Sequence, residues 1–320
     1  MNEEFNSTGA KLKKGKLGRI AIVGAGAVGS YYGARLAQSG EDVTFLMRSD
    51  YEHVSEYGLQ VESVHGDFTL PNVKCENSAE AIGEVDLVIV AWKATANAAA
   101  DEVLPPLLSE NTAILTLQNG LGNCELYAEK FGAERVLGGL CFVCINRMEA
   151  GLIRHTASGL VRVGEFGRAG SERLDLMQEV FSNAGFPCEK VENLEHAQWM
   201  KLVWNIPFNG LAIAEGGVDT EVILKERGLE DEVRALMLEV LACAAAFGCD
   251  IPQSFIEKQI EITHPMKKYR PSSMIDFVEG MPVEVEAIWE EPLRRAKEKN
   301  LFVPRMEALL ESIQKRMDER

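Results

Sequence analysis

The sequence lacks the patterns of several large protein classes. It has no apolar run near the roughly 18–20 residues that span a bilayer. It has no His-Glu-x-x-His, Walker or Gly-x-Ser-x-Gly motif, so metal hydrolysis, phosphoryl transfer and nucleophile-elbow hydrolysis have no support. Basic residues are in deficit, with 33 Lys and Arg against 49 Asp and Glu and a net charge of −16. Such a surface disfavours nucleic acid and anionic membranes as partners.

Cysteine forms no recognisable framework. The seven cysteines are odd in number, and a chain of 320 residues can build a core without disulfides. Cys141 and Cys144 have CxxC spacing, but their apolar, strand-like surroundings favour buried thiols over redox or metal use. Residues 1–18 carry lysines without an apolar stretch, which predicts a flexible N-terminal extension and no secretory signal. These features predict a cytoplasmic protein with reduced thiols.

A glycine-rich turn is the most informative stretch that is present. The apolar run 20–23 ends in Gly-x-Gly-x-x-Gly, an amphipathic helical pattern follows to about Ser39, and a second strand pattern occupies 42–47. In this strand–turn–helix context the spacing predicts a dinucleotide site, because the glycines allow a tight turn and close approach of a pyrophosphate to the helix start. The residues expected to form this site are Gly24, Ala25, Gly26, Ala27, Val28 and Gly29.

Alternating strand and helix patterns continue to about residue 192. From 193 onward almost every segment has helical spacing instead. The sequence therefore predicts an α/β fold with an N-terminal Rossmann doubly wound parallel sheet over 19–192 and an all-helical C-terminal domain over 193–320. The apolar runs that are typical of buried parallel strands are 85–91, 113–117 and 136–145.

Two local predictions concern the first half of the chain. An Ala-rich helix is expected over 95–104, ending at a pair of prolines. Residues 151–167 are expected to form a hairpin with an Ala-Ser-Gly turn. His155 lies in that hairpin, and a structural histidine is favoured over a catalytic one.

Polar residues follow several predicted strands. Arg48 comes after the second strand, Lys93 after the strand at 85–91, and Asn119 after the strand at 113–117. Ligands of open α/β sheets bind at the edge where parallel strands end. An acidic residue after the second strand binds the ribose of NAD, whereas an arginine accommodates the 2′-phosphate of NADP. Arg48 therefore favours NADP(H), with Asp50 close by as a conflicting signal and a solvated arginine as the alternative.

One predicted helix of the second half carries an unusual polar stripe. Lys201, Asn205 and Asn209 recur every fourth residue among apolar neighbours, so they share a helical face. Polar groups in such surroundings are costly unless they have partners, and desolvation would lower the pKa of Lys201 and suit it to proton transfer. The alternative is a solvated stripe on a buried helix. Pro207 predicts a kink or an early end of this helix.

A second polar cluster lies further along the chain. Ser272 and Asp276 are i, i+4 neighbours if helical, and Glu284 follows. This cluster could belong to a functional site. The alternative interpretation is a variant capping box, with Ser273 as N-cap and Asp276 at the third helical position.

Taken in order from about Arg19 to the C-terminus, these motifs resemble the ketopantoate reductases (2-dehydropantoate 2-reductases). The matching motifs are the glycine-rich turn, Lys93, Gln118-Asn119-Gly120, the Lys201, Asn205 and Asn209 stripe, and Ser272, Asp276 and Glu284. The resemblance implies that NADPH reduces the 2-oxo group of ketopantoate to give (R)-pantoate, for pantothenate and coenzyme A biosynthesis, in a cleft between two domains. A further family asparagine falls near Asp219 here.

The resemblance also implies residue roles. Lys201 would be the general acid, and Glu284 would orient Lys201 and the substrate. Arg48 and Lys93 would contact the adenosine 2′-phosphate. The residues implied to bind substrate are Asn119, which would also lie near the nicotinamide ribose, Asn205, Asn209 and Ser272, with Asp276 in support.

Two other functions stay open at this stage. The chain could reduce another 2-oxo acid, or it could be a non-catalytic NADP(H)-sensing protein on the same scaffold. Lys201 and Glu284 count against a sensor, which has no need of them. The expected partner is a small 2-oxo acid, with no nucleic acid and no membrane, and a homodimer is left open.

Overall fold

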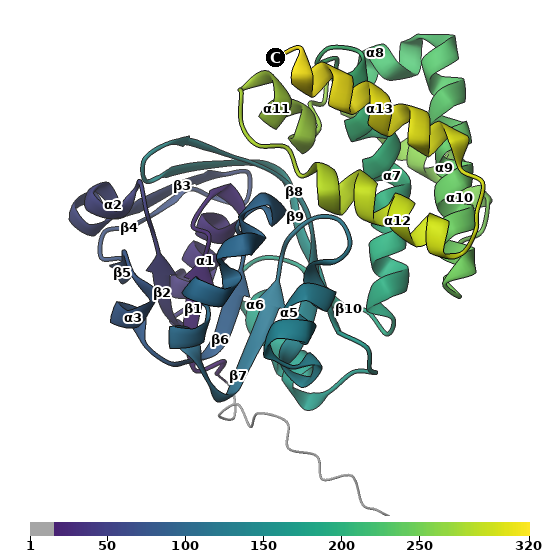
Figure 1. Cartoon of the computed structure of the whole chain (residues 1–320). Coiled ribbons are helices and arrows are strands. Elements are labelled where there is room, and N and C mark those ends of the chain that lie inside the picture. The colour runs from purple at the N-terminus through teal and green to yellow at the C-terminus, as the bar shows by residue number, and fades with distance from the viewer. Residues whose placement is uncertain (1–15) are drawn as a thin grey trace, which may run out of the picture. The chain divides into compact units, whose positions relative to one another are not determined.

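The computed structural model describes residues 16–320, which form two compact units (Figure 1). The α/β unit comprises the described chain up to Gln118 together with Asn123–Leu194, and the helical unit comprises Asn119–Gly122 and Glu195–Arg320. Of the predicted flexible extension, residues 1–15 lie outside the described residues. Leu17 is buried, and its N–H donates to the Glu41 carboxylate.

The α/β unit is built on one mixed sheet with a parallel centre. Among the described residues the strand order is β4-β3-β9-β8-β7-β6-β1-β2-β5, and β10 pairs with β9. The strands from β2 through β1, β6 and β7 to β8 pair in parallel, whereas β8 and β9 are antiparallel. The strands are β1 (Arg19–Val23), β2 (Asp42–Leu46), β3 (Leu59–Ser63), β4 (Phe68–Leu70), β5 (Cys75–Glu76), β6 (Val85–Val90), β7 (Leu108–Thr116), β8 (Val136–Glu149), β9 (Leu152–Glu165) and β10 (Cys188–Lys190). The predicted Rossmann-type fold class is confirmed.

Helices connect these strands as the alternating pattern predicts. After β1, α1 begins beyond Gly26 and ends at Gln38, where Gly40 turns the chain with φ +95°. The helical elements of this unit are α1 (Ala27–Gln38), α2 (Tyr51–Tyr57), α3 (Ala79–Ile82), η1 (Ala94–Ala99), α4 (Ala100–Val103), η2 (Pro105–Leu107), α5 (Asn123–Phe131), η3 (Ala133–Arg135) and α6 (Glu172–Asn183).

The expected Ala-rich helix over 95–104 differs from the structure. Its first half is the 3₁₀-helix η1, and only one α-helical turn, α4, follows. Alanine favours helix in general, but here the side chain of Asn97 bonds to Trp92 and Gln118, at 3.1 and 2.7 Å. Helix propensity depends on residue type alone and takes no account of such tertiary bonds, so it predicts local structure only weakly.

The predicted hairpin over 151–167 is wrong, because β9 is one continuous strand paired along β8. Phe142 pairs with Leu160 and Val143 with Ser158, so Gly159 is an extra residue in β9. Ser158 and Gly159 have φ values of +63° and +114°, and together they form a β-bulge. A glycine with positive φ suits a turn and a bulge equally, so local sequence could not separate them.

His155 occupies a buried position beside this bulge. Its Nδ1 lies 2.8 Å from Ser63 Oγ and its Nε2 lies 3.0 Å from the Ala157 carbonyl oxygen. Burial lowers the pKa of the imidazole below its usual value. A neutral ring with both nitrogens bonded agrees with the structural role expected for it.

The helical unit packs around its own hydrophobic core, which includes Trp199, Phe208 and Trp289. Its elements are α7 (Leu194–Ala214), α8 (Thr220–Lys225), α9 (Arg227–Ala246), α10 (Ser254–Thr263), η4 (His264–Met266), α11 (Ser272–Val278), the π-helical turn η5 (Glu286–Glu290), α12 (Glu291–Glu298) and α13 (Pro304–Asp318). Within residues 16–320 no helix combines the length and apolarity needed to cross a membrane.

The early end predicted for the helix around Pro207 does not occur. Helix α7 continues through Pro207 to Ala214. Its apolar residues Val203, Ile206 and Phe208 are fully buried, and Trp289 Nε1 donates to the Ile206 carbonyl oxygen at 3.1 Å. Packing along the whole length stabilises the helix against the hydrogen bond that proline removes.

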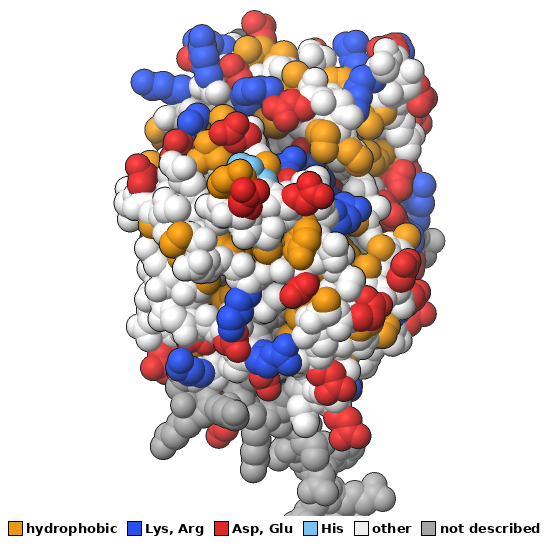
Figure 2. All heavy atoms as spheres, turned by 90° about the vertical axis from the view of Figure 1, so that its left-hand side faces the viewer, with side chains coloured by type: hydrophobic (Ala, Val, Ile, Leu, Met, Phe, Trp, Pro, Cys, Tyr) orange, Lys and Arg blue, Asp and Glu red, His pale blue; other side chains and the backbone are white. Residues whose placement is uncertain are grey.

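The cysteines form no disulfide framework, and charges of both signs mix on the face that Figure 2 shows. None of the seven cysteines forms a disulfide, and burial raises the pKa of Cys188 and Cys243 to about 12. Cys141 and Cys144 lie three residues apart on β8, so the pleat directs them to opposite faces. Both are half-buried, so the expectation of buried thiols is wrong for this pair. Figure 2 shows acidic and basic side chains interspersed over the face in view, with no continuous field of one sign.

Candidate active site

The glycine-rich turn between β1 and α1 has three glycines with different surroundings. Gly24 has φ +92°, and a Cβ on it would lie 2.1 Å from the Trp92 nitrogen. A Cβ on Gly29 would lie 2.3 Å from the Gly24 carbonyl oxygen. A Cβ on Gly26 would meet nothing within 4 Å. Gly24 and Gly29 are therefore required by the turn itself, whereas Gly26 borders open space.

This open space has the character of an anion site. It lies at the start of α1, whose first-turn N–H groups have no partners within a helix, and the first turn contains no acidic residue. Ser30 closes the turn, because its N–H donates to the Gly26 carbonyl oxygen and its hydroxyl to the Ala25 carbonyl oxygen. The turn therefore fits the pyrophosphate of a dinucleotide, as the sequence predicts.

The polar residues predicted after β2 and β6 belong to the same unit. Arg48 is exposed just beyond β2, and Lys93 is half-buried at the start of η1. Asp50, the conflicting acidic signal, is 8% exposed and forms an ion pair with Arg147 on β8. It is therefore not a free surface carboxylate.

A polar cluster that the sequence did not reveal lies after β6 and β7. The Asn97 Oδ1 accepts from Gln118 Nε2 at 2.7 Å and from the Tyr127 hydroxyl at 3.0 Å, and the Asn97 Nδ2 donates to Asn123 Oδ1 at 2.8 Å. Trp92 Nε1 also donates to the Tyr127 hydroxyl, at 3.1 Å. Asn97 thus bridges the residues on either side of Asn119–Gly122. Only Gln118, next to Asn119, gave any sequence signal for this cluster.

The helical unit brings two predicted site residues into direct contact. Lys201 Nζ on α7 donates to Asn119 Oδ1 at 2.7 Å, although 82 residues separate them in the chain. Asn119 opens the segment Asn119–Gly122, which is fixed against η5 because the Leu121 N–H donates to the Ala287 carbonyl oxygen at 2.9 Å. The half-buried ammonium therefore has a hydrogen-bond acceptor on a braced segment.

Glu284 lies near the residues that brace this segment. It precedes Ala287 by three residues and is 7% exposed. A Cβ on Gly120 would lie 2.2 Å from the Ala287 carbonyl oxygen, so only glycine with its φ of +84° allows so close an approach. The unit therefore gathers Asn119, Lys201 and the Glu284–Ala287 stretch from three distant parts of the chain.

The remaining predicted substrate residues have mixed surroundings. Asn209 is 2% exposed, and its Oδ1 accepts from the Ser273 N–H at 2.9 Å. That bond gives Asn209 a structural role at the start of α11. The alternative interpretation as a capping box is wrong, because α11 begins at Ser272 after Pro271 as N-cap and makes no side-chain capping bond. Asn209, from another helix, takes the place of a local capping side chain.

The other members of this group lie in reach of solvent. Ser272 is exposed at the first position of α11, whereas Asp276 and Asn205 are half-buried. Asn205 lies between Lys201 and Asn209 on the α7 stripe. Asp219, at the position of the further family asparagine, caps α8 by accepting from the Val222 N–H at 3.1 Å.

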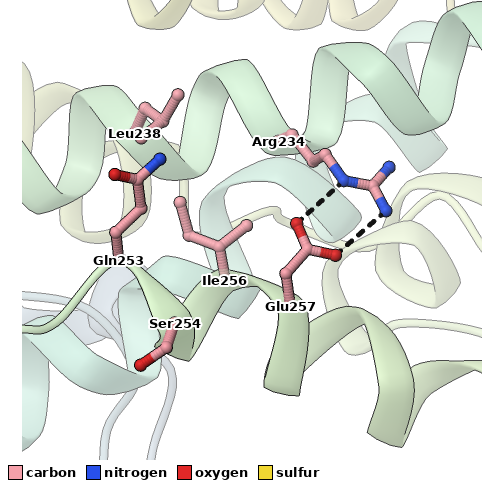
Figure 3. Close-up of a pocket in the computed structure, with 6 residues that line it drawn as sticks. All are labelled: Arg234, Leu238, Gln253, Ser254, Ile256 and Glu257. Atoms are coloured by element: carbon pink, nitrogen blue, oxygen red, sulfur yellow. Dashed lines mark hydrogen bonds and ion pairs between the residues drawn. The ribbon is translucent and has the colours of Figure 1, made fainter.

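In the part of the chain that the structure describes, no group of three or more His, Cys, Asp or Glu side chains could hold a metal ion. A hollow of about 340 Å³ lies between α9 and α10. Figure 3 shows the Glu257 carboxylate facing the Arg234 guanidinium there, with Nε 3.1 Å from Oε1. That ion pair satisfies the charged groups of the hollow within the protein.

The glycine turn has room for a pyrophosphate, and in the helical unit a lysine donates to an amide oxygen. These two features define the chain as an oxidoreductase of the nicotinamide-nucleotide class. A sequence model described as ketopantoate reductase PanE/ApbA matches residues 20–168, and its C-terminal counterpart matches 193–317. The chain belongs to the ketopantoate reductase family.

Individual relatives agree with this assignment. The chain is 42% identical to a 2-dehydropantoate 2-reductase from Nostoc sp. over 91% of this chain and 92% of the relative. The crystal structure of the enzyme so named from Geobacter metallireducens is 45% identical with a TM-score of 0.91, covering 93% of this chain and 99% of that one. The one from Methylococcus capsulatus is 33% identical with a TM-score of 0.87, covering 94% and 97%.

Proposed function

We propose that this protein catalyses the NADPH-dependent reduction of ketopantoate to (R)-pantoate, a step of pantothenate and coenzyme A biosynthesis. The observation that carries this proposal is the hydrogen bond from Lys201 Nζ to Asn119 Oδ1 at 2.7 Å. A lysine held by an amide oxygen, which accepts a hydrogen bond but takes no proton, keeps its ammonium oriented and available for transfer.

The chemistry assigns a role to each group. NADPH, when bound, supplies the hydride for the 2-oxo carbon. Lys201 gives a proton to the carbonyl oxygen and stabilises the negative charge that develops there, and positioned proton transfer contributes about 10²–10⁴-fold. The Glu284 carboxylate, which is 7% exposed, orients Lys201 and the substrate. Asn119 links the cofactor and the substrate because it lies after β7 in the chain and bonds to Lys201.

The cofactor is assigned to residues of the α/β unit and to Asn119. The backbone of Gly24, Ala25, Gly26, Ala27, Val28 and Gly29 binds the pyrophosphate. The exposed Arg48 and the half-buried Lys93 bind the adenosine 2′-phosphate. NADP(H) is favoured over NAD(H) because an arginine, with no free carboxylate beside it, follows β2.

The 2-oxo acid is assigned to polar side chains of the helical unit. Asn119, Asn205 and Ser272 offer hydrogen bonds to its oxygens, with Asp276 in support. Asn209 uses its Oδ1 to cap α11, so its contribution to the substrate comes from its Nδ2.

The wider assignments follow the same proposal. We assign cofactor binding to 19–192 and substrate binding and catalysis to 193–320, preceded by the extension 1–18. A cytoplasmic location agrees with seven cysteines that form no disulfide. Dimerisation stays a prediction, which sedimentation velocity of the purified protein tests.

The decisive experiment follows NADPH oxidation with ketopantoate beside a panel of other 2-oxo acids. We expect the highest kcat/KM with ketopantoate. A higher kcat/KM with another 2-oxo acid would assign the site to that substrate. Binding of NADPH without turnover of any 2-oxo acid would refute an enzymatic role and favour the sensor.

A further inference from the structure

The end of β2 carries an unexpected charge arrangement. Arg48, Ser49 and Asp50 follow the strand, and Arg48 is exposed whereas Asp50 is 8% exposed. The Asp50 Oδ1 accepts from the Ser49 hydroxyl at 2.8 Å and forms an ion pair with Arg147 Nη1. Arg147 Nη1 also lies 3.4 Å from Ser49 Oγ. The Asp50 carboxylate therefore has two donors within the protein, the Ser49 hydroxyl and the Arg147 guanidinium.

This position decides which nicotinamide nucleotide a Rossmann-type sheet prefers. A free carboxylate after the second strand accepts from the ribose 2′-hydroxyl of NAD and repels a 2′-phosphate. The chain has a carboxylate at this position, Asp50, only two residues from the cation of Arg48. The other acidic residues near this edge are Glu52 in the first turn of α2, which is exposed, and Glu76 on β5, whose backbone pairs with Leu46. Without a countercharge, Asp50 would oppose the preference that Arg48 gives.

The countercharge comes from a distant part of the chain. Arg147 belongs to β8 and is placed by its pairing with Ile153 on β9, so the long antiparallel pair delivers a guanidinium to the end of β2. The Arg147 side chain is 43% exposed and that of Asp50 is 10% exposed. An ion pair with one buried partner is more weakly screened by salt than a surface pair.

We propose that Arg147 is a specificity-determining residue for NADP(H), because it neutralises Asp50 and leaves Arg48 as the exposed charge of the segment 48–50. The proposal rests on the function proposed above in one respect only, that NADP(H) binds to the α/β unit. It adds that the nucleotide preference depends on a residue 97 positions away from Asp50 in sequence.

The test measures binding, with no turnover needed. The dissociation constants of NADPH and NADH are measured by fluorescence titration for the wild type, R147L, D50N and the double variant R147L/D50N. R162L serves as the matched control, because Arg162 forms an exposed ion pair with Glu189 at 2.8 Å in the same sheet. Circular dichroism confirms that each variant is folded.

We expect the wild type and R162L to prefer NADPH, and R147L to lose at least about tenfold of that preference as the freed Asp50 carboxylate repels the phosphate. Removing both charges should return the NADPH affinity to within about threefold of wild type, because the repelling carboxylate is gone. An unchanged preference in R147L would overturn the inference. So would a double variant as weak as R147L, which would mean that Arg147 acts through its own charge.

Two further outcomes keep this inference separate from the proposed function. If R147L does not fold, D50N decides, because without the carboxylate the Arg147 cation has no countercharge and NADPH should bind at least as tightly as to the wild type, whereas a loss of affinity would show that Asp50 itself contacts the nucleotide. A wild type that binds neither nucleotide refutes the proposed function as well, whereas a wild type that binds NADPH and reduces ketopantoate leaves it intact whatever R147L does.

Discussion

Replacing Lys201 with methionine removes the ammonium but keeps an unbranched side chain of similar length on α7. The structure shows what is lost, namely the proton donor and its hydrogen bond to Asn119 at 2.7 Å. Loss of a positioned general acid lowers kcat by about 10²–10⁴-fold, which corresponds to about 2.7–5.4 kcal/mol at 1.36 kcal/mol per factor of ten. NADPH affinity should change little, because the glycine turn belongs to the other unit.

Asn119→Ala provides the second arm of this experiment. It removes the acceptor from the ammonium, and a hydrogen bond to a charged group contributes about 1.5–3 kcal/mol, so kcat should fall by about 10–100-fold. If Asn119 acts through Lys201, the double variant should be no slower than Lys201→Met alone. Stopped-flow measurement of NADPH oxidation with saturating ketopantoate gives these rates. A Lys201→Met protein within tenfold of wild type would refute the role of general acid.

Three further predictions concern the glycine turn, a buried ion pair and the cluster around Asn97. Gly26→Ala should leave the melting temperature unchanged and weaken NADPH binding at least about tenfold by titration, since its Cβ enters the open space beside α1. Burial alone would raise the pKa of Glu165, but its bonds to Arg173 and others hold the pKa below its usual value. The ionised Glu165 therefore stabilises the folded state fully above about pH 4.3, and this stabilisation is lost as the pH falls through the lower folded pKa. Glu165→Gln should therefore cost about 3–5 kcal/mol in urea unfolding near neutral pH and flatten the acid side of the stability curve, and an unchanged curve would contradict this. Tyr127→Phe deletes a hydroxyl bonded to Gln118 at 2.9 Å, so the free energy of unfolding should fall by about 1–3 kcal/mol.

Much of the fold could be predicted because the patterns that specify its elements lie within single short stretches of the chain. The turn from β1 to α1 depends on glycine spacing and on apolar periodicity, both of which a single stretch of chain contains. The same holds for the stripe of Lys201, Asn205 and Asn209 on α7, which helical geometry places on one face whatever surrounds it.

The features that local sequence did not predict depend on distant partners. Gly159 is a bulge because β8 pairs on both sides of it. Asn209 caps α11 because tertiary packing brings Ser273 to it. The ion pair of Asp50 with Arg147 likewise depends on where β8 ends. In each case the residue type permits several structures, and a partner that is remote in sequence selects one.

The membership of Asn119–Gly122 in the helical unit has a consequence for how this protein can be divided. A fragment cut before residue 195 carries all of α9 to α13 but leaves behind Asn119–Gly122, in which Asn119 bonds to Lys201 and Leu121 to Ala287. Exchanging C-terminal halves between relatives would therefore pair each lysine with a foreign Asn119 segment. A chimaera that respects the physical module must transplant this short insert together with the C-terminal half.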